Sequence, residues 1–257
     1  MSPVLLFDCD GVLADTEAHG HRVAFNRMWR EFGVPWEWSV AAYGKKLAIS
    51  GGRERMRSLY HDAEFRAAYP PPTSEDEWDE RVARWHVRKT AIYREMIASG
   101  AIPPRSGVKR LAEEALDAGW VLGVCSTSNP ASVRSVLEHV MGKDTAAQFS
   151  LLLGGDMVAV KKPAPDIYVR AARELDVSPA ECLVIEDTRN GLLAATRAGM
   201  CCLVTVSGYT ADEDFSEAAL VVSCLGDPGG ETCRVLANRS AARPGDCVTA
   251  VDLSAML

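Results

Sequence analysis

The sequence has no long apolar run, no long basic run and no acidic tail. A membrane-spanning helix needs roughly 20 consecutive apolar residues, and no stretch of this chain approaches that length. Proteins that bind along a nucleic-acid duplex carry clustered Lys and Arg, whereas the formal net charge here is −7. We therefore expect neither a membrane nor a nucleic acid as a partner.

Cysteine motifs for metal binding or redox chemistry are also missing, although the chain contains 8 cysteines. There is no CxxC pair and no Cys/His cluster, and most cysteines lie in apolar runs such as VLGVC and CCLVTV. This distribution is typical of buried, reduced thiols in a reducing compartment. Structured sequence begins within three residues of the first Met, which leaves no room for a signal peptide, so we expect a cytoplasmic protein.

The sequence does contain a series of short apolar runs, with helical patterns between them. The runs are PVLLFDC, WVLGVCS, SLLLGG, CLVIED, CCLVTV and ALVVSC, and none alternates cleanly between apolar and polar residues. Such runs indicate strands buried on both faces. One intervening helix is expected to begin at Ser106 as N-cap and another at Asn190. The alternation predicts an α/β fold with a Rossmann-like, doubly wound parallel sheet.

A second, all-helical domain is expected directly after the first strand, because residues 16–100 show only helical patterns. Ser74 and the Glu three residues later resemble a capping box for its last helix, and its tryptophans are expected to form its core. We therefore predict a catalytic core of residues 1–15 and 101–257 and a helical cap domain of residues 16–100. The weakly patterned segment after about Gly226 is expected to be an appendage to the core.

Polar residues follow the predicted strands, and in an open parallel sheet ligands bind beyond the carboxyl ends of the strands. Each motif by itself is common in loops and helix caps. Their convergence on one edge of the sheet is more informative than any one of them. The motifs are DCDG at 8–11, STSN at 126–129, GGD at 154–156, KKP at 161–163 and ED at 186–187.

The carboxylates at this edge predict a metal site. Residues two apart in an extended strand face the same side, roughly 6–7 Å apart, so we expect Asp8 and Asp10 to share a side and Cys9 to point away. Glu186 and Asp187 add two further carboxylates from another strand. A site made of hard oxygen ligands indicates Mg²⁺ as the cofactor. The candidate metal ligands are therefore Asp8, Asp10, Glu186 and Asp187.

An anionic ligand is expected beside this metal. Lys162 and the hydroxyl groups of Ser126 and Thr127 are placed to bind it. A cation that joins carboxylates to an anionic ligand is the usual arrangement for phosphoryl transfer.

These motifs, taken together, resemble those of the haloacid dehalogenase-like superfamily. DCDGVLADT, CSTSN, KKPAPDIY and VIEDTRNGLLAATRAG are similar to its four signature motifs, in the same order, over about residues 3–228. The helical insert resembles the C1-type cap of that superfamily. DTEAHGHRVAFN, SGGRERM, and SGYTADEDF followed by CLGDP are similar to the CbbY subgroup, sugar-phosphate phosphatases found beside Rubisco in bacteria and plastids.

The resemblance implies a substrate. CbbY-type enzymes remove a phosphate from xylulose 1,5-bisphosphate, a side product of Rubisco that inhibits it. We therefore expect a small-molecule sugar phosphate as the partner, with xylulose 1,5-bisphosphate or a similar ketose bisphosphate as the substrate. We also expect a monomer, cytoplasmic or, if a transit peptide has been removed, located in the plastid stroma.

The resemblance also implies roles for the core carboxylates. Asp8 is the nucleophile that forms an aspartyl-phosphate. Asp10 is the general acid and base, and its backbone carbonyl also binds the metal. Asp187 is a direct metal ligand, and Glu186 is either a ligand or a neighbour bridged by water.

The phosphate-binding residues implied by the resemblance are Ser126 and Lys162, both of which also count as catalytic. Lys162 is preferred to Lys161, because the family's lysine directly precedes a proline. Thr127 and Asn129 are further expected contacts of the substrate.

The resemblance further implies substrate contacts in the helical insert. Glu17 and His21 are four residues apart on a predicted helix and share a face, where they are expected to contact sugar hydroxyl groups. The arginines of SGGRERM are expected to clamp the distal phosphate, and its glycines to allow close approach, although a helix-surface charge stripe is the alternative interpretation. The candidate residues are Glu17, His21, Gly51, Gly52, Arg53 and Arg55.

Other functions remain open. A β-phosphoglucomutase-like mutase has the same aspartates, a similar cap and the same phospho-aspartate, but passes the phosphate to a sugar hydroxyl group instead of water. A non-catalytic phosphate-sensing paralogue on the same fold is a second alternative. A dehalogenase fits poorly, because that chemistry needs no acid two residues after the nucleophile, where this chain has Asp10.

Overall fold

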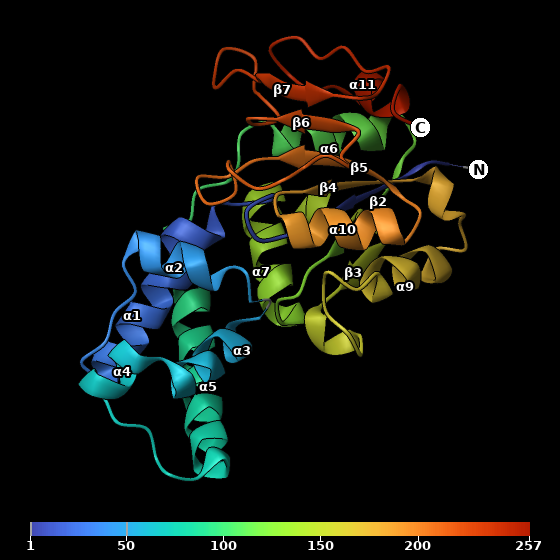
Figure 1. Cartoon of the computed structure of the whole chain (residues 1–257). Helices are drawn as coiled ribbons and strands as arrows, with labels where there is room; N and C mark the ends of the chain where they lie inside the picture. Colours follow the sequence, from blue (N-terminus) through green and yellow to red (C-terminus); the bar gives the residue numbers. More distant parts are fainter. Residues whose placement is uncertain (1, 50) are drawn as a thin grey trace. The chain divides into compact units, whose positions relative to one another are not determined.

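The computed structural model describes residues 2–49 and 51–257, which belong to two compact units (Figure 1). One unit contains the chain up to Asp15 and, after an insertion, Pro103–Leu257. The other is the insertion itself, Thr16–Ile102. The chain thus returns to the first unit two residues later than position 101, where the sequence analysis placed the boundary.

The first unit is built around a sheet that has seven strands within the described residues, in the order β3-β2-β1-β4-β5-β6-β7 (Figure 1). All six predicted runs form strands, and they pair in parallel, which confirms the predicted fold class. The seventh strand was not predicted and pairs antiparallel to β6. The strands are β1 (Val4–Phe7), β2 (Val121–Cys125), β3 (Leu151–Leu153), β4 (Cys182–Glu186), β5 (Cys201–Thr205), β6 (Leu220–Val222) and β7 (Val235–Asn238).

Strand β1 lies at the centre of the sheet, between β2 and β4. All four of its residues are fully buried, because both faces of the sheet are covered, and this explains the missing apolar/polar alternation. Phe7 pairs with Val124 of β2 and with Ile185 of β4. The strand that follows β1 along the chain, β2, pairs on one side of it, whereas β4 pairs on the other side. The strand order therefore reverses at β1, and the end of β1 is a topological switch point, where ligands bind in such sheets.

Helices connect the strands of this unit. On one face, α9 and α10 pack against alternate residues of β1 and β4, including Val4, Leu6 and Val184. The helices are α6 (Val108–Asp117), α7 (Pro130–Met141), α8 (Lys143–Ala146), α9 (Asp166–Glu174), α10 (Arg189–Arg197) and α11 (Ala250–Ser254), with 3₁₀ turns at Gly155–Met157 and Pro179–Glu181.

Two helix starts were predicted at the wrong residue. Ser106 is not the N-cap of α6; its hydroxyl donates to the carboxylate of Asp227 (3.0 Å), which also accepts from the Gly107 N–H (2.6 Å). A distant carboxylate thus replaces the local cap. Helix α10 is capped by Thr188 and not by Asn190.

The second unit is all-helical within the described residues. The predicted N-cap of its longest helix, Ser74, accepts a hydrogen bond from the Glu77 N–H (3.4 Å). No helix in the described part of the chain is both long and apolar enough to span a bilayer. The elements of this unit are a π-helical turn (Glu17–His21), α1 (Arg22–Glu31), α2 (Val40–Lys46), α3 (Gly52–Arg57), a 3₁₀ turn (Ser58–His61), α4 (Ala63–Ala68) and α5 (Glu75–Ala98).

The core of the helical unit is aromatic, as its tryptophans predicted. The ring of Trp38 packs edge-on against Trp29 (centroids 4.7 Å apart) and Phe25 (4.9 Å), and all three side chains are buried. The buried amide of Asn26 donates to the Trp38 carbonyl (3.0 Å) and accepts from the Trp38 N–H (2.9 Å). One side chain therefore satisfies both backbone groups of a core residue that lies outside any helix.

We expect the Asn26→Ala variant to lower the free energy of unfolding by about 1–3 kcal/mol, because it leaves the N–H and C=O of Trp38 buried without partners. Urea unfolding followed by tryptophan fluorescence measures this. The exposed Arg30, on the same helix, gives a matched control: Arg30→Ala should change stability by less than about 0.5 kcal/mol. Equal unfolding midpoints for the two variants would contradict the role of Asn26.

Candidate active site

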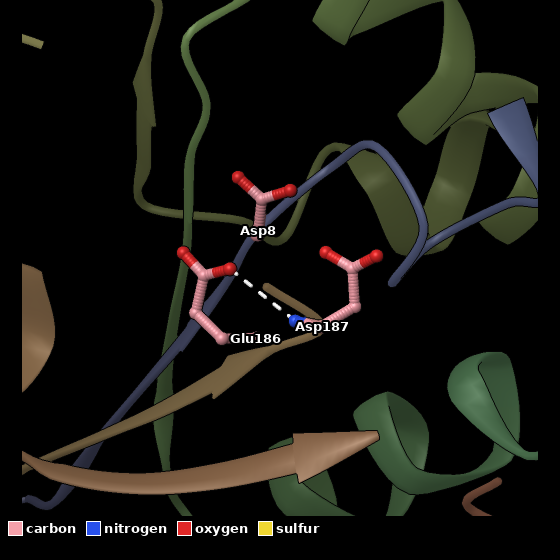
Figure 2. A group of neighbouring side chains, drawn as sticks. All are labelled: Asp8, Glu186 and Asp187. Carbon is pink, nitrogen blue, oxygen red and sulfur yellow. Dashed lines mark hydrogen bonds between the residues drawn. The ribbon is translucent and has the colours of Figure 1, made fainter. Parts of the chain in front are cut away.

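Three buried carboxylates meet at the end of β1. Asp8 directly follows this strand, Glu186 is the last residue of β4, and Asp187 is the next residue. Oxygen atoms of the three carboxylates lie within 4.8 Å of one another, and Figure 2 shows the three side chains gathered at one place. The Asp187 N–H donates to a Glu186 oxygen (3.3 Å), which helps to fix the position of that side chain (Figure 2).

A buried lysine joins two of these carboxylates. The Nζ atom of Lys162 lies 2.6 Å from an oxygen of Asp8 and 2.6 Å from an oxygen of Glu186, and it also donates to the Cys125 carbonyl (2.9 Å). Three carboxylates and one ammonium group leave a net charge of −2 when all are ionised. The group therefore carries an excess of negative charge in a site with little solvent.

This environment changes the protonation of the site. Burial raises the pKa of Asp8 to about 8; the positive charge of Lys162 opposes this shift, and the negative charges of Glu186 and Asp10 add to it. Burial by itself would lower the pKa of Lys162, but the charges of Asp8 and Glu186 raise it well above its ordinary value. The lysine therefore stays protonated, whereas Asp8 needs a further cation to be ionised at neutral pH.

Two glycines leave the space that the carboxylates occupy. A Cβ atom on Gly11 would lie 2.1 Å from an oxygen of Asp187, and one on Gly191 would lie 1.9 Å from the carboxyl carbon of Glu186. Gly11 also has a φ of 86°, a conformation that favours glycine. The donor set, three converging carboxylates with room kept around them, fits the hard oxygen ligands that Mg²⁺ prefers.

Asp10 lies beside this group but in a different setting. Strand β1 ends at Phe7 and the chain turns at Gly11, so both aspartates lie beyond the strand, and a shared side for Asp8 and Asp10 stays a prediction. The half-buried Asp10 carboxylate accepts from the hydroxyl of Ser128 (2.6 Å) and from that of Ser126 (3.5 Å). Asp10 is thus the more accessible acid of the pair.

The STSN segment lies between β2 and α7. Ser126 is buried, and its hydroxyl accepts from the Ser128 N–H (3.1 Å); Thr127 is half-buried. Asn129 is exposed, and its side chain caps α7 by accepting from the Ala131 N–H (3.0 Å). The structure therefore brings Ser126 to the carboxylate group through Asp10, whereas Asn129 caps α7 and also donates to the carboxylate of Asp156 (3.4 Å).

Tyr168 was not predicted as a site residue, although it lies in the motif KKPAPDIY. The buried Tyr168 hydroxyl donates to Oε1 of Glu186 (2.5 Å), the same oxygen that accepts from Lys162. One Glu186 oxygen is therefore held by two donors, while the other receives only the longer bond from the Asp187 N–H among the contacts described above. Ser128 was also missed as a partner of Asp10. The sequence indicates a site role for Tyr168 and Ser128 only through their position inside motifs that contain other site residues.

In the helical unit, Arg55 and Glu17 are held in one polar group. The Arg55 guanidinium donates to the Tyr43 hydroxyl (2.8 Å) and the Ile49 carbonyl (2.9 Å), and lies 3.4 Å from the Glu17 carboxylate. The Tyr43 hydroxyl donates a short hydrogen bond to the same carboxylate. Arg53, in contrast, is exposed.

His21 belongs to a second polar group of that unit. Its ring is buried and stacks on Tyr93 (centroids 4.1 Å apart), and its Nδ1 lies 2.7 Å from Nζ of the buried Lys89. Glu17 and His21 thus begin and end one π-helical turn but contact different residues. Gly51 and Gly52 lie at the start of α3, where Gly51 has a φ of 96°. Tyr43 and Lys89 were not singled out from the sequence.

Comparisons with known proteins find similar sequences and similar folds. The model of the haloacid dehalogenase-like hydrolase family matches residues 3–199. A CBBY-like protein of Arabidopsis thaliana is 44% identical over 229 residues, which cover 88% of this chain and 70% of that protein.

Two solved structures show the same fold. A variant of CbbY from Rhodobacter sphaeroides, crystallised in complex with xylulose 1,5-bisphosphate, has a TM-score of 0.78 and 36% identity, with 87% of this chain and 95% of that chain covered. A β-phosphoglucomutase from Clostridium difficile has a TM-score of 0.66 and 27% identity, with coverage of 87% and 92%.

We expect Gly191→Ala to destabilise the protein, although alanine in a helix is ordinarily favoured over glycine by about 1 kcal/mol. The added Cβ would overlap the Glu186 carboxyl group, so we expect the free energy of unfolding to fall by about 1–3 kcal/mol. Thermal unfolding of the metal-free protein measures the effect. Gly208→Ala is the control, since a Cβ there meets nothing within 4 Å. A Gly191→Ala variant as stable as the wild type would show that the space is not required.

Proposed function

Because the chain belongs to the haloacid dehalogenase-like hydrolase family and is a CbbY-like phosphatase within it, we propose that it removes one phosphate from a ketose bisphosphate, with xylulose 1,5-bisphosphate as the first candidate. The observation that carries this proposal is the bridge from Lys162 to Asp8 and Glu186 inside the group of three carboxylates. The similarity to a CbbY structure that holds this bisphosphate supports the choice of substrate.

Asp8 is the nucleophile in this proposal. It sits at the switch point of the sheet, and Lys162 holds one of its oxygens, which leaves the other for attack on phosphorus. The reaction forms an aspartyl-phosphate on Asp8 and releases the sugar. Lys162 and the hydroxyl of Ser126 offset negative charge on the transferring phosphate, and Thr127 is a further candidate contact.

Asp10 is the general acid and base. Its carboxylate is half-buried, so it can exchange a proton with solvent. The hydrogen bond from the Ser128 hydroxyl fixes its orientation. In the first step it donates a proton to the leaving sugar oxygen. In the second step it takes a proton from the water that attacks the aspartyl-phosphate.

The same residues are proposed to hold Mg²⁺. Asp8, Glu186 and Asp187 would supply carboxylate oxygens, and Asp10 its backbone carbonyl. When bound, Mg²⁺ supplies positive charge that offsets the repulsion between the substrate phosphate and the carboxylates. Tyr168 and Lys162 position Glu186 by holding one of its oxygens.

Substrate contacts in the helical unit belong to the same proposal. Arg55 is a stronger candidate than Arg53 for the distal phosphate, because its guanidinium is positioned by surrounding acceptors, whereas Arg53 is exposed. Glu17 and His21 remain proposed contacts of the sugar hydroxyl groups. Gly51 and Gly52 remain proposed to allow close approach of the substrate.

A phosphosugar mutase is the second candidate function, because the β-phosphoglucomutase structure is similar to most of the chain. The two reactions differ only in the acceptor of the phosphate, which is water for a hydrolase and a sugar hydroxyl group for a mutase.

We expect a panel of sugar mono- and bisphosphates, ranked by kcat/KM with and without EDTA, to place xylulose 1,5-bisphosphate first with release of free phosphate. Asp8→Asn should lower kcat by at least about 10³-fold, because an amide cannot act as the nucleophile. Asp117→Asn, at an exposed position at the end of α6, is the control and should leave kcat unchanged. Interconversion of hexose phosphates without phosphate release would reject the hydrolase in favour of the mutase.

We expect the affinity for Mg²⁺ to rise with pH between about 6 and 8. The raised pKa of Asp8, about 8, means that below this pH the metal-free carboxyl group carries a proton that Mg²⁺ must displace. Calorimetric titration at pH 7 in two buffers of different ionisation enthalpy measures the released proton. The Asp8→Asn variant should release none. A Kd that does not change with pH would show that Asp8 is already ionised without the metal.

A further inference from the structure

Three cysteines lie together in the C-terminal segment, outside the active site described above. Cys224 follows β6, Cys233 precedes β7, and Cys247 precedes α11. All are free thiols; Cys224 and Cys233 are buried, and Cys247 is half-buried. The sequence analysis treated this segment as an appendage and gave its thiols no role.

The register of the sheet places two of these cysteines opposite each other. Strands β6 and β7 pair antiparallel, with Val222 opposite Val235. The Ser223 N–H donates to the Arg234 carbonyl (2.9 Å), which continues this pairing by one residue. Extending this register by two residues beyond the end of β6 at Val222 and before the start of β7 at Val235 brings Cys224 opposite Cys233. Directly opposite residues of an antiparallel pair have Cα atoms about 4.5–5.5 Å apart. A disulfide requires a Cα separation of about 4.4–6.8 Å, a range that includes this general spacing.

The sulfur of Cys224 also contacts the segment that precedes β7. Its thiol donates to the carbonyl of Thr232, the residue before Cys233, at 3.4 Å. Gly226 lies against the other two cysteines, since a Cβ atom on it would lie 3.0 Å from the backbone nitrogen of Cys233 and 3.0 Å from the Cα atom of Cys247. These contacts place the three cysteines in one part of the fold, which we call the thiol cluster.

A tight turn connects the two cysteines. The Gly230 N–H donates to the Asp227 carbonyl (2.9 Å), and the Asp227 N–H donates to the Glu231 carbonyl (2.9 Å). Residues 228–232 are exposed, so local opening of this turn gives a reagent access to both sulfurs. The carboxylate of Asp227 also binds the start of α6, which connects the turn to the core of the unit.

We propose that Cys224 and Cys233 are a redox modification site, which closes to a disulfide by exchange with a disulfide oxidant such as oxidised glutathione. One protein thiolate attacks the oxidant, which forms a mixed disulfide and releases one thiol. The second protein thiolate then displaces the second thiol. The two protein thiols together lose two protons and two electrons, and the oxidant gains both and is reduced to two thiols. The disulfide locks the turn to the β6–β7 edge, and reduction releases it.

Peptide mapping tests the proposal directly. The reduced, full-length protein is incubated with excess oxidised glutathione, free thiols are alkylated, and the protein is digested with Glu-C and trypsin without reduction. Cleavage after Glu217, Glu231, Arg234 and Arg239 separates the three cysteines onto the peptides 218–231, 232–234 and 240–257. We expect a peptide that links 218–231 to 232–234 and that disappears on treatment with dithiothreitol.

Thermal unfolding gives a second readout. Closing this short loop should raise Tm by about 5 °C in the oxidised protein relative to the reduced protein. Cys233→Ser should lose both the linked peptide and the shift in Tm, whereas the control Cys247→Ser should keep both. A link from 232–234 to 240–257, or no link at all, would overturn the proposal. Since neither readout uses phosphatase activity, the outcome is independent of the proposed function.

Discussion

The site depends on one interaction, the bridge that Lys162 forms between the carboxylates of Asp8 and Glu186. Burial of these charges costs several kcal/mol for each ion, and this cost is offset only when the pairing geometry is good. Two contacts of 2.6 Å and a backbone carbonyl provide that geometry for the ammonium group. Tyr168, on the same Glu186 oxygen, adds a donor that keeps the carboxylate in place. The remaining negative charge makes a cation and an anionic phosphate ester complementary to the site.

The sheet makes this bridge possible because it joins segments that are far apart in the sequence. Asp8 and Glu186 meet because β1 and β4 are direct neighbours, and Lys162, which lies between β3 and α9, reaches Asp8 from 154 residues away. The central position of β1 buries Asp8, and burial is the largest cause of its raised pKa. The glycines at 11 and 191 matter for the same reason, since any side chain there would fill the space of a carboxylate. The packing around the carboxylates, their shared charge and the raised pKa of Asp8 are thus all consequences of the order of strands in the sheet.

Much of the fold could be predicted from local patterns. Strands buried on both faces are uniformly apolar, so all six runs were recognised and became the parallel part of the sheet. Helix boundaries were less predictable, because caps also come from distant residues. The carboxylate of Asp227 accepts from the Gly107 N–H and the Ser106 hydroxyl at the start of α6, where Ser106 was expected to act alone. Strand β7 was missed because the mostly exposed residues of this edge strand carry no clear apolar pattern.

The sequence by itself determined which residue types stand at the strand ends, and therefore the class of chemistry. Asp8, Glu186, Asp187 and Lys162 were all identified as candidates from their place after apolar runs. Only the tertiary structure decided which of these side chains contact one another. Lys162 bridges two of the carboxylates, Asp10 accepts from Ser128, and Tyr168 donates to Glu186. The physical reason is that side-chain direction and burial arise from contacts between strands and helices distant in the chain, which no local pattern encodes.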